Sequence, residues 1–404
     1  MSAAFAISQR TRLNALYNSN TFKAYISMQD IRVWGDVNQL DIGSSNKFAL
    51  HQAWGEYFLH NGVSIKLGRQ ELVYDDSRIF GNVGWAQQAR AHDLGLFKYE
   101  SSNLKLHIGF AFNQKKEALA GTDYYADYSQ GIYTLNNNYK SMQFAWLNTK
   151  ILNSNLSLLF LNNGMESVEN SNGASKLKTI FSQTIGGRFT PNLGPVQIAA
   201  AAYYQMGKVQ SEITNLSAMY LSLAGTSKIN GNITFVLGAE YLSGTSLKDK
   251  MLDGNKIKSF TPLYGTNHKF NGHMDYFFVG NHSNNVGLVD IYSTISYKIN
   301  KWNFFATPHY FRSAAKVYSP KGSTSTAFVD SEYEQLNKNL GLEIDLGITY
   351  SPQKEVSISL GFSEMFGNET LAHIQGKSPE NNYSKTGSWA YLMFTFSPTF
   401  YSSK

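Results

Sequence analysis

The chain has 404 residues, a formal net charge of +6, 16% charged residues, 14% aromatic residues and no cysteine. Soluble domains usually contain about 25% charged residues, and the sequence has no run of 18 apolar residues that would form a membrane-spanning helix. The lack of cysteine excludes disulfide bonds and thiolate chemistry, and the scattered lysines form no basic block of the kind that binds nucleic acid. A closed β-barrel is the membrane-spanning structure that these exclusions leave.

Several segments alternate apolar and polar residues along the chain. The clearest are 104–113, 233–242, 340–350 and 390–397. A period of two with one continuous apolar face indicates a strand with one apolar side. Segments of about ten residues with this pattern, closed by turn residues, are typical of transmembrane barrels.

The connections between the predicted strands alternate between short and long. Short turns are expected at 18–20, 61–62, 101–103, 153–155, 191–194, 230–232, 300–301 and 352–354. Long polar segments are expected at 37–46, 75–85, 114–137, 165–175, 207–213, 246–285, 316–332 and 367–386. Outer-membrane barrels have short periplasmic turns and long extracellular loops. The pattern therefore predicts an all-β fold, a transmembrane antiparallel up-and-down β-barrel that forms one domain over residues 1–404.

The connections divide the chain into 17 strands. The first, near Phe5 to Tyr17, and the last, near Trp389 to Phe400, both end on the periplasmic side, whereas a closed barrel of this class has an even number of strands. We therefore expect a signal peptide and one further strand before Phe5, which gives 18 strands in the native protein. A 16-stranded barrel is the alternative.

The polar face of these strands is expected to line a lumen, because the apolar face meets lipid. Mixed basic and acidic side chains would suit a polar, charged solute that is held weakly at many points. Arg69 and Asp93 do not fit the alternation and are expected at bulges or above the membrane. The residues predicted to line the pore or guide solutes are Arg10, Arg12, Lys66, Arg69, Arg78, Arg90, Asp93, Lys105, His107, Arg188, Glu240, Asp290, Glu343 and Asp345.

Arginine is concentrated in the first part of the chain, where six of the eight arginines precede residue 91. Because arginine binds carboxylates in two places at once, one interpretation is a wall that guides anions. The other is a ladder of arginine–carboxylate pairs that braces the barrel, with Glu56, Glu71, Asp75 and Asp93 as partners. Both interpretations stay open at this stage.

The segment 246–285 is too long for an ordinary connection. It contains His268, Gly272 and Asp275, but the spacing of its histidines matches no standard set of metal ligands. We expect this loop to fold into the lumen as a constriction or plug and to gate entry, with 114–137 as a second gate. No metal site and no cofactor are predicted.

Two groups of residues carry a family resemblance. The first is 67–72 (Leu-Gly-Arg-Gln-Glu-Leu) with Arg78, Gly81, 85–88 (Trp-Ala-Gln-Gln), Arg90 and Asp93, and the second is 268–272 (His-Lys-Phe-Asn-Gly) with Asp275 and 287–290 (Gly-Leu-Val-Asp). Together they resemble the markers of the alginate-export family of outer-membrane β-barrels. The resemblance implies an 18-stranded monomeric barrel whose electropositive, loop-gated pore passes an acidic polysaccharide to the outside. It matches Arg10, Arg12, Arg69, Arg78 and Arg90 to arginines that line that pore.

The resulting functional prediction is a non-enzymatic outer-membrane channel, or porin, of a Gram-negative bacterium. It would pass polar, anionic solutes such as acidic oligo- or polysaccharides, and its partners would be membrane lipid, lipopolysaccharide, the solute and other envelope proteins. One alternative is a barrel that serves as a subunit or anchor of a larger envelope complex, with a plugged lumen. A second is an outer-membrane hydrolase, although the chain has no Gly-x-Ser-x-Gly nucleophile motif.

Overall fold

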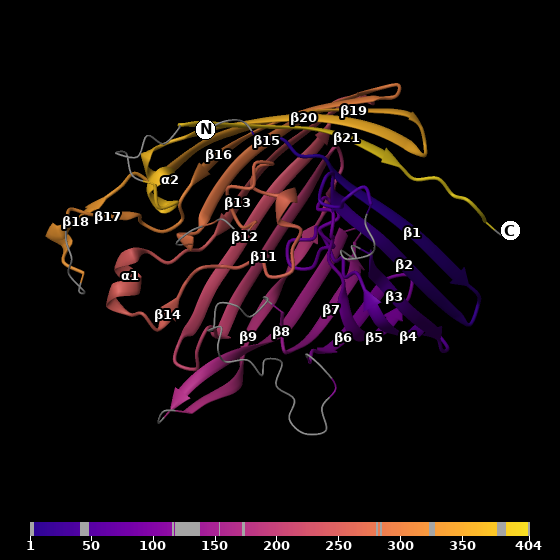
Figure 1. Cartoon of the computed structure of the whole chain (residues 1–404), viewed down its shortest axis with the longest axis horizontal. Coiled ribbons are helices and arrows are strands. Elements are labelled where there is room, and N and C mark those ends of the chain that lie inside the picture. The colour runs from indigo at the N-terminus through magenta and orange to yellow at the C-terminus, as the bar shows by residue number, and fades with distance from the viewer. Residues whose placement is uncertain are drawn as a thin grey trace.

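One curved antiparallel sheet forms the wall of the protein (Figure 1). The computed structural model describes residues 4–40, 48–114, 117, 138–152, 154–171, 174–279, 282, 285–322, 328–377 and 385–402. The sheet has 19 strands, of which β10 (Asn192–Leu193) and β14 (Lys256–Ile257) have two residues each, which leaves 17 long strands in the described part. The predicted number of 17 strands is therefore confirmed.

The long strands follow one another in chain order. The first nine are β1 (Ser8–Asn18), β2 (Phe22–Val33), β3 (Phe48–Phe58), β4 (Val63–Gln70), β5 (His92–Glu100), β6 (Leu104–Phe112), β7 (Ser141–Ile151), β8 (Ser154–Ser171) and β9 (Ala174–Thr190). The other eight are β11 (Val196–Lys208), β12 (Asn215–Lys228), β13 (Ile233–Leu242), β15 (Leu288–Ile299), β16 (Trp302–Arg312), β19 (Asn339–Gln353), β20 (Val356–Gly367) and β21 (Thr386–Phe396). Each pairs antiparallel with the next long strand, which confirms the up-and-down topology.

The remaining elements are short and lie in the long connections. They are α1 (Leu247–Leu252), η3 (Asn267–Lys269), β17 (Tyr318–Pro320), η5 (Asp330–Glu332), β18 (Tyr333–Gln335) and α2 (Glu369–Ile374). No helix in the described ranges is long and apolar enough to span a membrane. Among the described residues no pairing joins β21 to β1, and most positions of both strands are exposed. The choice between 18 and 16 native strands stays a prediction.

The predicted long loop at 165–175 is wrong. β8 and β9 pair without interruption from Asn155↔Thr190 to Ser171↔Ala174. Glu166 and Ser167 of β8 are consecutive, polar and both buried, so this part of the strand lacks the alternation of an apolar and a polar face and its sequence looks like a loop. In contrast, the short turn at Asn61–Gly62 was predicted correctly, and both residues have positive φ, as a two-residue hairpin turn requires.

The two faces of the wall differ in the way that the alternation predicts. Leu13, Leu237 and Leu392 on the outer face are each more than half exposed, whereas Gln29 and Glu343 on the inner face are buried. Apolar side chains that face outward from such a curved sheet suit contact with lipid. The inner polar side chains are buried by protein, which identifies the enclosed space as the place where loops pack.

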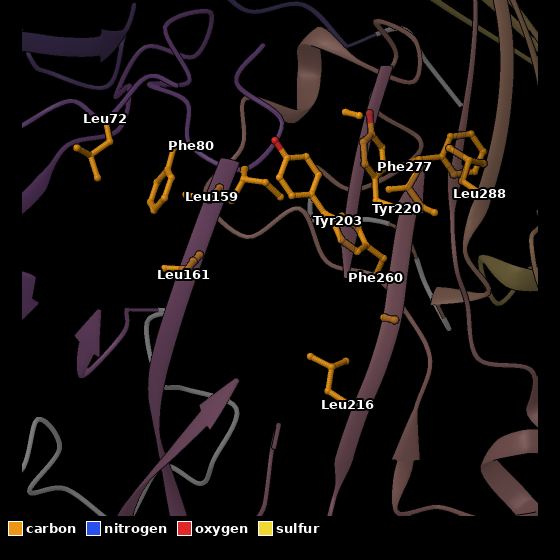
Figure 2. Close-up of a cluster of buried hydrophobic side chains, with 14 of the residues drawn as sticks. Leu72, Phe80, Leu159, Leu161, Tyr203, Leu216, Tyr220, Phe260, Phe277 and Leu288 are labelled. Atoms are coloured by element: carbon orange, nitrogen blue, oxygen red, sulfur yellow. The ribbon is translucent and has the colours of Figure 1, made fainter. Parts of the chain in front are cut away.

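A core of apolar side chains lies on the inner face of the wall (Figure 2). Phe80 comes from the connection between β4 and β5, and Phe260 and Phe277 come from the connection between β13 and β15. They belong to one buried cluster that also contains Leu161 of β8 and Tyr220 of β12. The packing of these side chains holds the two connections inside the wall, so the protein core forms where a simple barrel would have an empty lumen.

Candidate functional site

Two long connections meet inside the wall: the connection 71–91 between β4 and β5, and the connection 243–287 between β13 and β15. The amide of Gly81 donates to the carbonyl of Tyr264 at 2.9 Å, and the amide of Thr266 donates to the carbonyl of Ser77 at 2.9 Å. Phe80 and Tyr264 form a parallel bridge, and their rings stack with centroids 5.8 Å apart. We call this unit the paired loops, because backbone hydrogen bonds join the two segments directly.

The connection 71–91 is bonded to widely separated wall strands. Arg78 forms a buried ion pair with Glu240 of β13, and Asp76 accepts from Nε of Arg188 on β9 at 3.1 Å. On the opposite side of the sheet, Nη1 of Arg10 on β1 donates to the carbonyl of Ala86 at 3.1 Å. The loop therefore crosses the enclosed space and is attached to β1 at one edge of the sheet and to β9 and β13 in its middle.

The connection 243–287 is held by four inner-face carboxylates, which we call the acidic patch. The amide of Met274 donates to Glu343 at 2.8 Å and the amide of His273 donates to Asp345 at 3.2 Å. The patch consists of Glu240, Asp290, Glu343 and Asp345, and all four are at most 5% exposed. Buried charges of one sign need compensation, and these carboxylates obtain it from loop amides and from cationic side chains.

Side-chain partners compensate Glu240, Asp290 and Asp345, whereas Oε2 of Glu343 is buried without a hydrogen-bond partner among the described residues. Asn271 donates to Glu240 at 3.1 Å and to Asp290 at 3.2 Å. His309 of β16 lies between Asp290 and Asp345, with nitrogen–oxygen distances of 3.0 Å and 3.7 Å. The predicted inward direction of all four carboxylates agrees with the structure, but the loop covers them. They hold the loop in place and do not border the cavities described below.

Gly272, predicted as a gating residue, has a structural reason to be glycine. Its φ is +84°, and a Cβ atom there would lie 2.5 Å from the carboxyl carbon of Glu343. The two other predicted gating residues bond to each other, with His268 Nδ1 and Asp275 Oδ1 2.7 Å apart. Burial lowers the pKa of the nearby His273. Within the described residues no group of three or more His, Asp or Glu is placed to hold a metal ion.

A cavity of about 1290 Å³ lies on the long-loop side of the paired loops, and we call it the outer cavity. Wall residues such as Asn163, Ser182 and Gln205 border it together with Tyr264 and His268 of the paired loops. Its charged border consists of five basic residues and one acidic residue: Arg69, Arg90, Lys208, Lys250, Lys256 and Asp93. The electrostatic potential in this space is therefore expected to be positive.

A second cavity of about 230 Å³ lies near the short-turn ends of β8 and β9. Asp75 of the paired loops, Trp146, Ser157 and Arg188 are among the residues that border it. The indole of Trp146 lies 3.3 Å from both carboxylate oxygens of Asp75. Space thus exists on both sides of the connection 71–91. The second predicted gate, 114–137, lies almost entirely outside the described residues.

The predicted basic residues on the inner face have different partners. Arg12 donates to Gln29 at 2.6 Å and lies 3.9 Å from Glu71. The ammonium group of Lys66 lies 3.8 Å from the centre of the Trp54 ring. His107 lies 2.9 Å from Glu100, whereas Lys105 is exposed and pairs in register with Glu100 across to β5.

Arg69 and Asp93 lie on the outward-facing side of their strands, near the outer rim. They are register partners, joined by an ion pair of 2.8 Å, and Arg69 has the same parity as the exposed Ile65 and Leu67. This placement explains why neither residue fits the polar face of the alternation. Both also border the outer cavity, close to the end of β4 and the beginning of β5.

Arginine–carboxylate pairs account for five of the eight arginines. Their members are Arg12–Glu71, Arg32–Asp30, Arg69–Asp93, Arg78–Glu240 and Arg188–Asp76. Of the expected partners, Glu56 instead pairs with Lys98 at 2.8 Å. Most of these arginines therefore have bracing contacts, while Arg10 and Arg90 donate to backbone carbonyls.

Several residues of the site were not singled out from the sequence. Asp76, Asn271 and His309 each make a contact that holds the paired loops or the acidic patch. Asn271 lies within the second family marker, which was the available signal for it. His309 has inward parity on β16, but Pro308 beside it obscures the alternation.

No protein-family model matches this chain, and no curated protein matches it. Solved structures share its fold. OccD3 (OpdP) of Pseudomonas aeruginosa superimposes with a TM-score of 0.58 at 13% identity, covering 97% of this chain and 86% of that one. OccK9 (OpdG) of the same organism gives 0.54 at 12% identity, covering 96% and 91%. P. aeruginosa OpdK with vanillate gives 0.53 at 11% identity, covering 89% and 87%.

Proposed function

We propose that the chain is an outer-membrane channel for the passive passage of polar, anionic solutes. The observation that carries this proposal is the outer cavity, a polar space of about 1290 Å³ with five basic residues and one acidic residue on its border. A cavity lined by one sign of charge and enclosed by low-dielectric walls concentrates solutes of the opposite sign. The paired loops beneath the cavity then form the constriction.

The buried charges of the lumen do not oppose this selectivity. The acidic patch is covered by the connection 243–287, and its charge is compensated by Arg78, His309 and loop amides. A carboxylate compensated in this way contributes little field to a solute beyond the loop. The accessible charges are then mainly the basic residues of the outer cavity, which favours anions over cations.

The location and the solute class draw on the structural neighbours. OpdK is an outer-membrane protein of P. aeruginosa and was also crystallised with vanillate, a carboxylate. From this likeness we infer that the chain lies in the outer membrane of a Gram-negative bacterium. We also infer that it passes solutes without an enzymatic step. Passage of an acidic polysaccharide such as alginate is the narrower form of the proposal, and it rests on the two sequence markers.

Planar-bilayer recording tests the proposal directly. Purified protein should give ion currents, and under a KCl gradient the reversal potential should lie on the chloride side because the cavity is basic. Neutralising Arg10 and Arg12 together should shift that potential toward the potassium side if these inner-face arginines guide anions. Currents with no preference for chloride would contradict the selectivity, and an absence of current would contradict the channel itself.

A plugged barrel that serves as a subunit of an envelope complex is the second candidate. It is favoured by the contacts of the paired loops, which reach β1 on one side and β19 on the other. A plug of this kind should block current until it is removed. If the wild-type protein does not conduct but a variant lacking residues 258–283 does, the subunit function with a plugged lumen is preferred.

A further inference from the structure

Arg90 differs from the other arginines that face the enclosed space. Its guanidinium is largely buried, and Nη1 donates to the carbonyl of Gly265 at 2.9 Å. No carboxylate forms an ion pair with it among the described residues, whereas Arg12, Arg78 and Arg188 each have one. Burial lowers the pKa of this guanidinium, but arginine stays charged at neutral pH. A charge without a counterion is thus held at the border of the outer cavity.

Trp85 provides an apolar surface at the same border. One face of its indole stacks on His268 with ring centroids 4.0 Å apart, and the residue is still 43% exposed. Gly265 and His268 are three residues apart, so the groups that hold Arg90 and Trp85 are within about 10 Å of each other. Both side chains border the outer cavity. The cavity therefore has on its border a cationic fork and a flat apolar surface, both held by the short stretch 265–268.

We propose that Arg90 and Trp85 form a subsite for a carboxylate carried on a ring. The guanidinium would bind the carboxylate at two points, and the exposed indole surface would cover the ring. This proposal rests on the channel function proposed above and names the chemical group that the outer cavity selects. Two kinds of solute share this chemistry, aromatic carboxylates and sugar acids, and the experiment distinguishes them.

A purely structural role for Arg90 has a different consequence. The bond to Gly265 joins the connection 71–91 to the connection 243–287, so Arg90 also supports the paired loops. A lysine at this position keeps the positive charge, but all its donors are on a single nitrogen, so it loses the planar two-point contact. If Arg90 only supported the loops, ring carboxylates and simple carboxylates would be affected equally by its replacement.

Isothermal titration of the purified full chain in detergent tests the subsite. The probes are benzoate and galacturonate, with acetate as a carboxylate without a ring and benzyl alcohol as a ring without a carboxylate. The ring carboxylates should bind more tightly than acetate or benzyl alcohol. Arg90→Gln should weaken that binding about 10- to 100-fold, the range expected for a charge-assisted hydrogen-bonded pair.

Matched variants identify the source of the effect. Arg69→Gln removes an arginine that borders the same cavity but is paired with Asp93, so it should change the affinity less than twofold. Arg90→Lys should give an intermediate loss, and Trp85→Leu should weaken ring carboxylates but not acetate. Tighter binding of benzoate would assign an aromatic acid, and tighter binding of galacturonate would assign a sugar acid.

Three results would overturn the subsite: no binding of either ring carboxylate, an affinity unchanged in Arg90→Gln, or acetate binding as tightly as both. The titration requires no membrane and no current. A conducting protein that binds neither probe would therefore contradict the subsite and leave the channel standing. A protein that binds the probes without conducting would support the subsite and contradict the channel.

Discussion

The acidic patch and the outer cavity both contain several charged side chains. Those of the patch are buried and bonded to protein groups, whereas those of the cavity border open space. The four carboxylates of the patch are buried and are bonded to loop amides, Arg78 or His309. The basic residues of the cavity border a space of about 1290 Å³, and Lys256 among them is exposed. Charge in the patch holds the loops, whereas charge in the cavity remains available to a solute.

The difference shows why residue type alone does not identify a solute-binding residue. Glu343 and Arg90 are both inward-facing, ionisable and conspicuous in the sequence. Glu343 accepts from the amide of Met274 under the loop, while Arg90 has one carbonyl partner and borders open space. Variants in the patch should therefore affect stability, and variants at the cavity should affect solutes.

Arg78→Leu should have the largest effect on stability. It leaves Glu240 as a buried carboxylate without its cationic partner, at a cost of about 3–5 kcal/mol. The free energy of unfolding, measured in detergent by denaturant titration, should fall by this amount. The double variant Arg78→Leu, Glu240→Leu removes both charges and should recover most of the loss. If the double variant is no more stable than the single one, the ion pair is not what Arg78 contributes.

Gly272→Ala should have the next largest effect, because the added methyl group would lie against the carboxyl group of Glu343 in a backbone conformation of positive φ. We expect a loss of about 2–4 kcal/mol from strain and overpacking together. Gly376→Ala is the matched control, since Gly376 has φ +72° and no atom lies within 4 Å of the position that a Cβ atom would take there. It should lose only the conformational part, about 1–2 kcal/mol. Equal losses would show that contact with the acidic patch does not constrain the loop.

Lys208→Gln combined with Lys256→Gln should have the smallest effect on stability, within about 0.5 kcal/mol. Both residues border the outer cavity, so the pair should lose part of its chloride preference. Reversal potentials in planar bilayers measure this change. Asp330→Asn, which removes an exposed charge paired with Lys248 away from the cavity, should leave the potential unchanged. If the double lysine variant loses stability but keeps its reversal potential, the cavity residues support the fold and do not select solutes.

The wall could be predicted from the sequence because lipid and water impose a period of two on every strand. Leu342 and Leu346 face outward while Glu343 and Asp345 face inward, as the alternation indicates. The same reasoning missed the upper part of the β8–β9 hairpin, where consecutive buried polar residues such as Glu166 and Ser167 break the alternation. The signal for a strand is thus limited to the part that lies against an apolar medium.

The interior could not be predicted to the same extent, because it depends on contacts between distant segments. The inward direction of Glu240 follows from parity, but nothing near Glu240 in the sequence indicates Arg78 as its partner. Leu161 on β8 also faces inward against the strand pattern, and it is apolar because the paired loops cover it. The alternation of residues predicts a polar inner face around an empty lumen. In this protein the inner face is partly apolar, because the paired loops pack against it.

The ion pair between Arg78 and Glu240 has a consequence for the order of assembly. The two residues are 162 positions apart, and Asn271, the other partner of Arg78, is 193 positions away. The connection 71–91 emerges early during synthesis but obtains its partners only after β13 and the loop beyond it are in place. Contacts of such long range form slowly. The ion pair of Arg78 therefore forms late in folding, after most of the wall is in place.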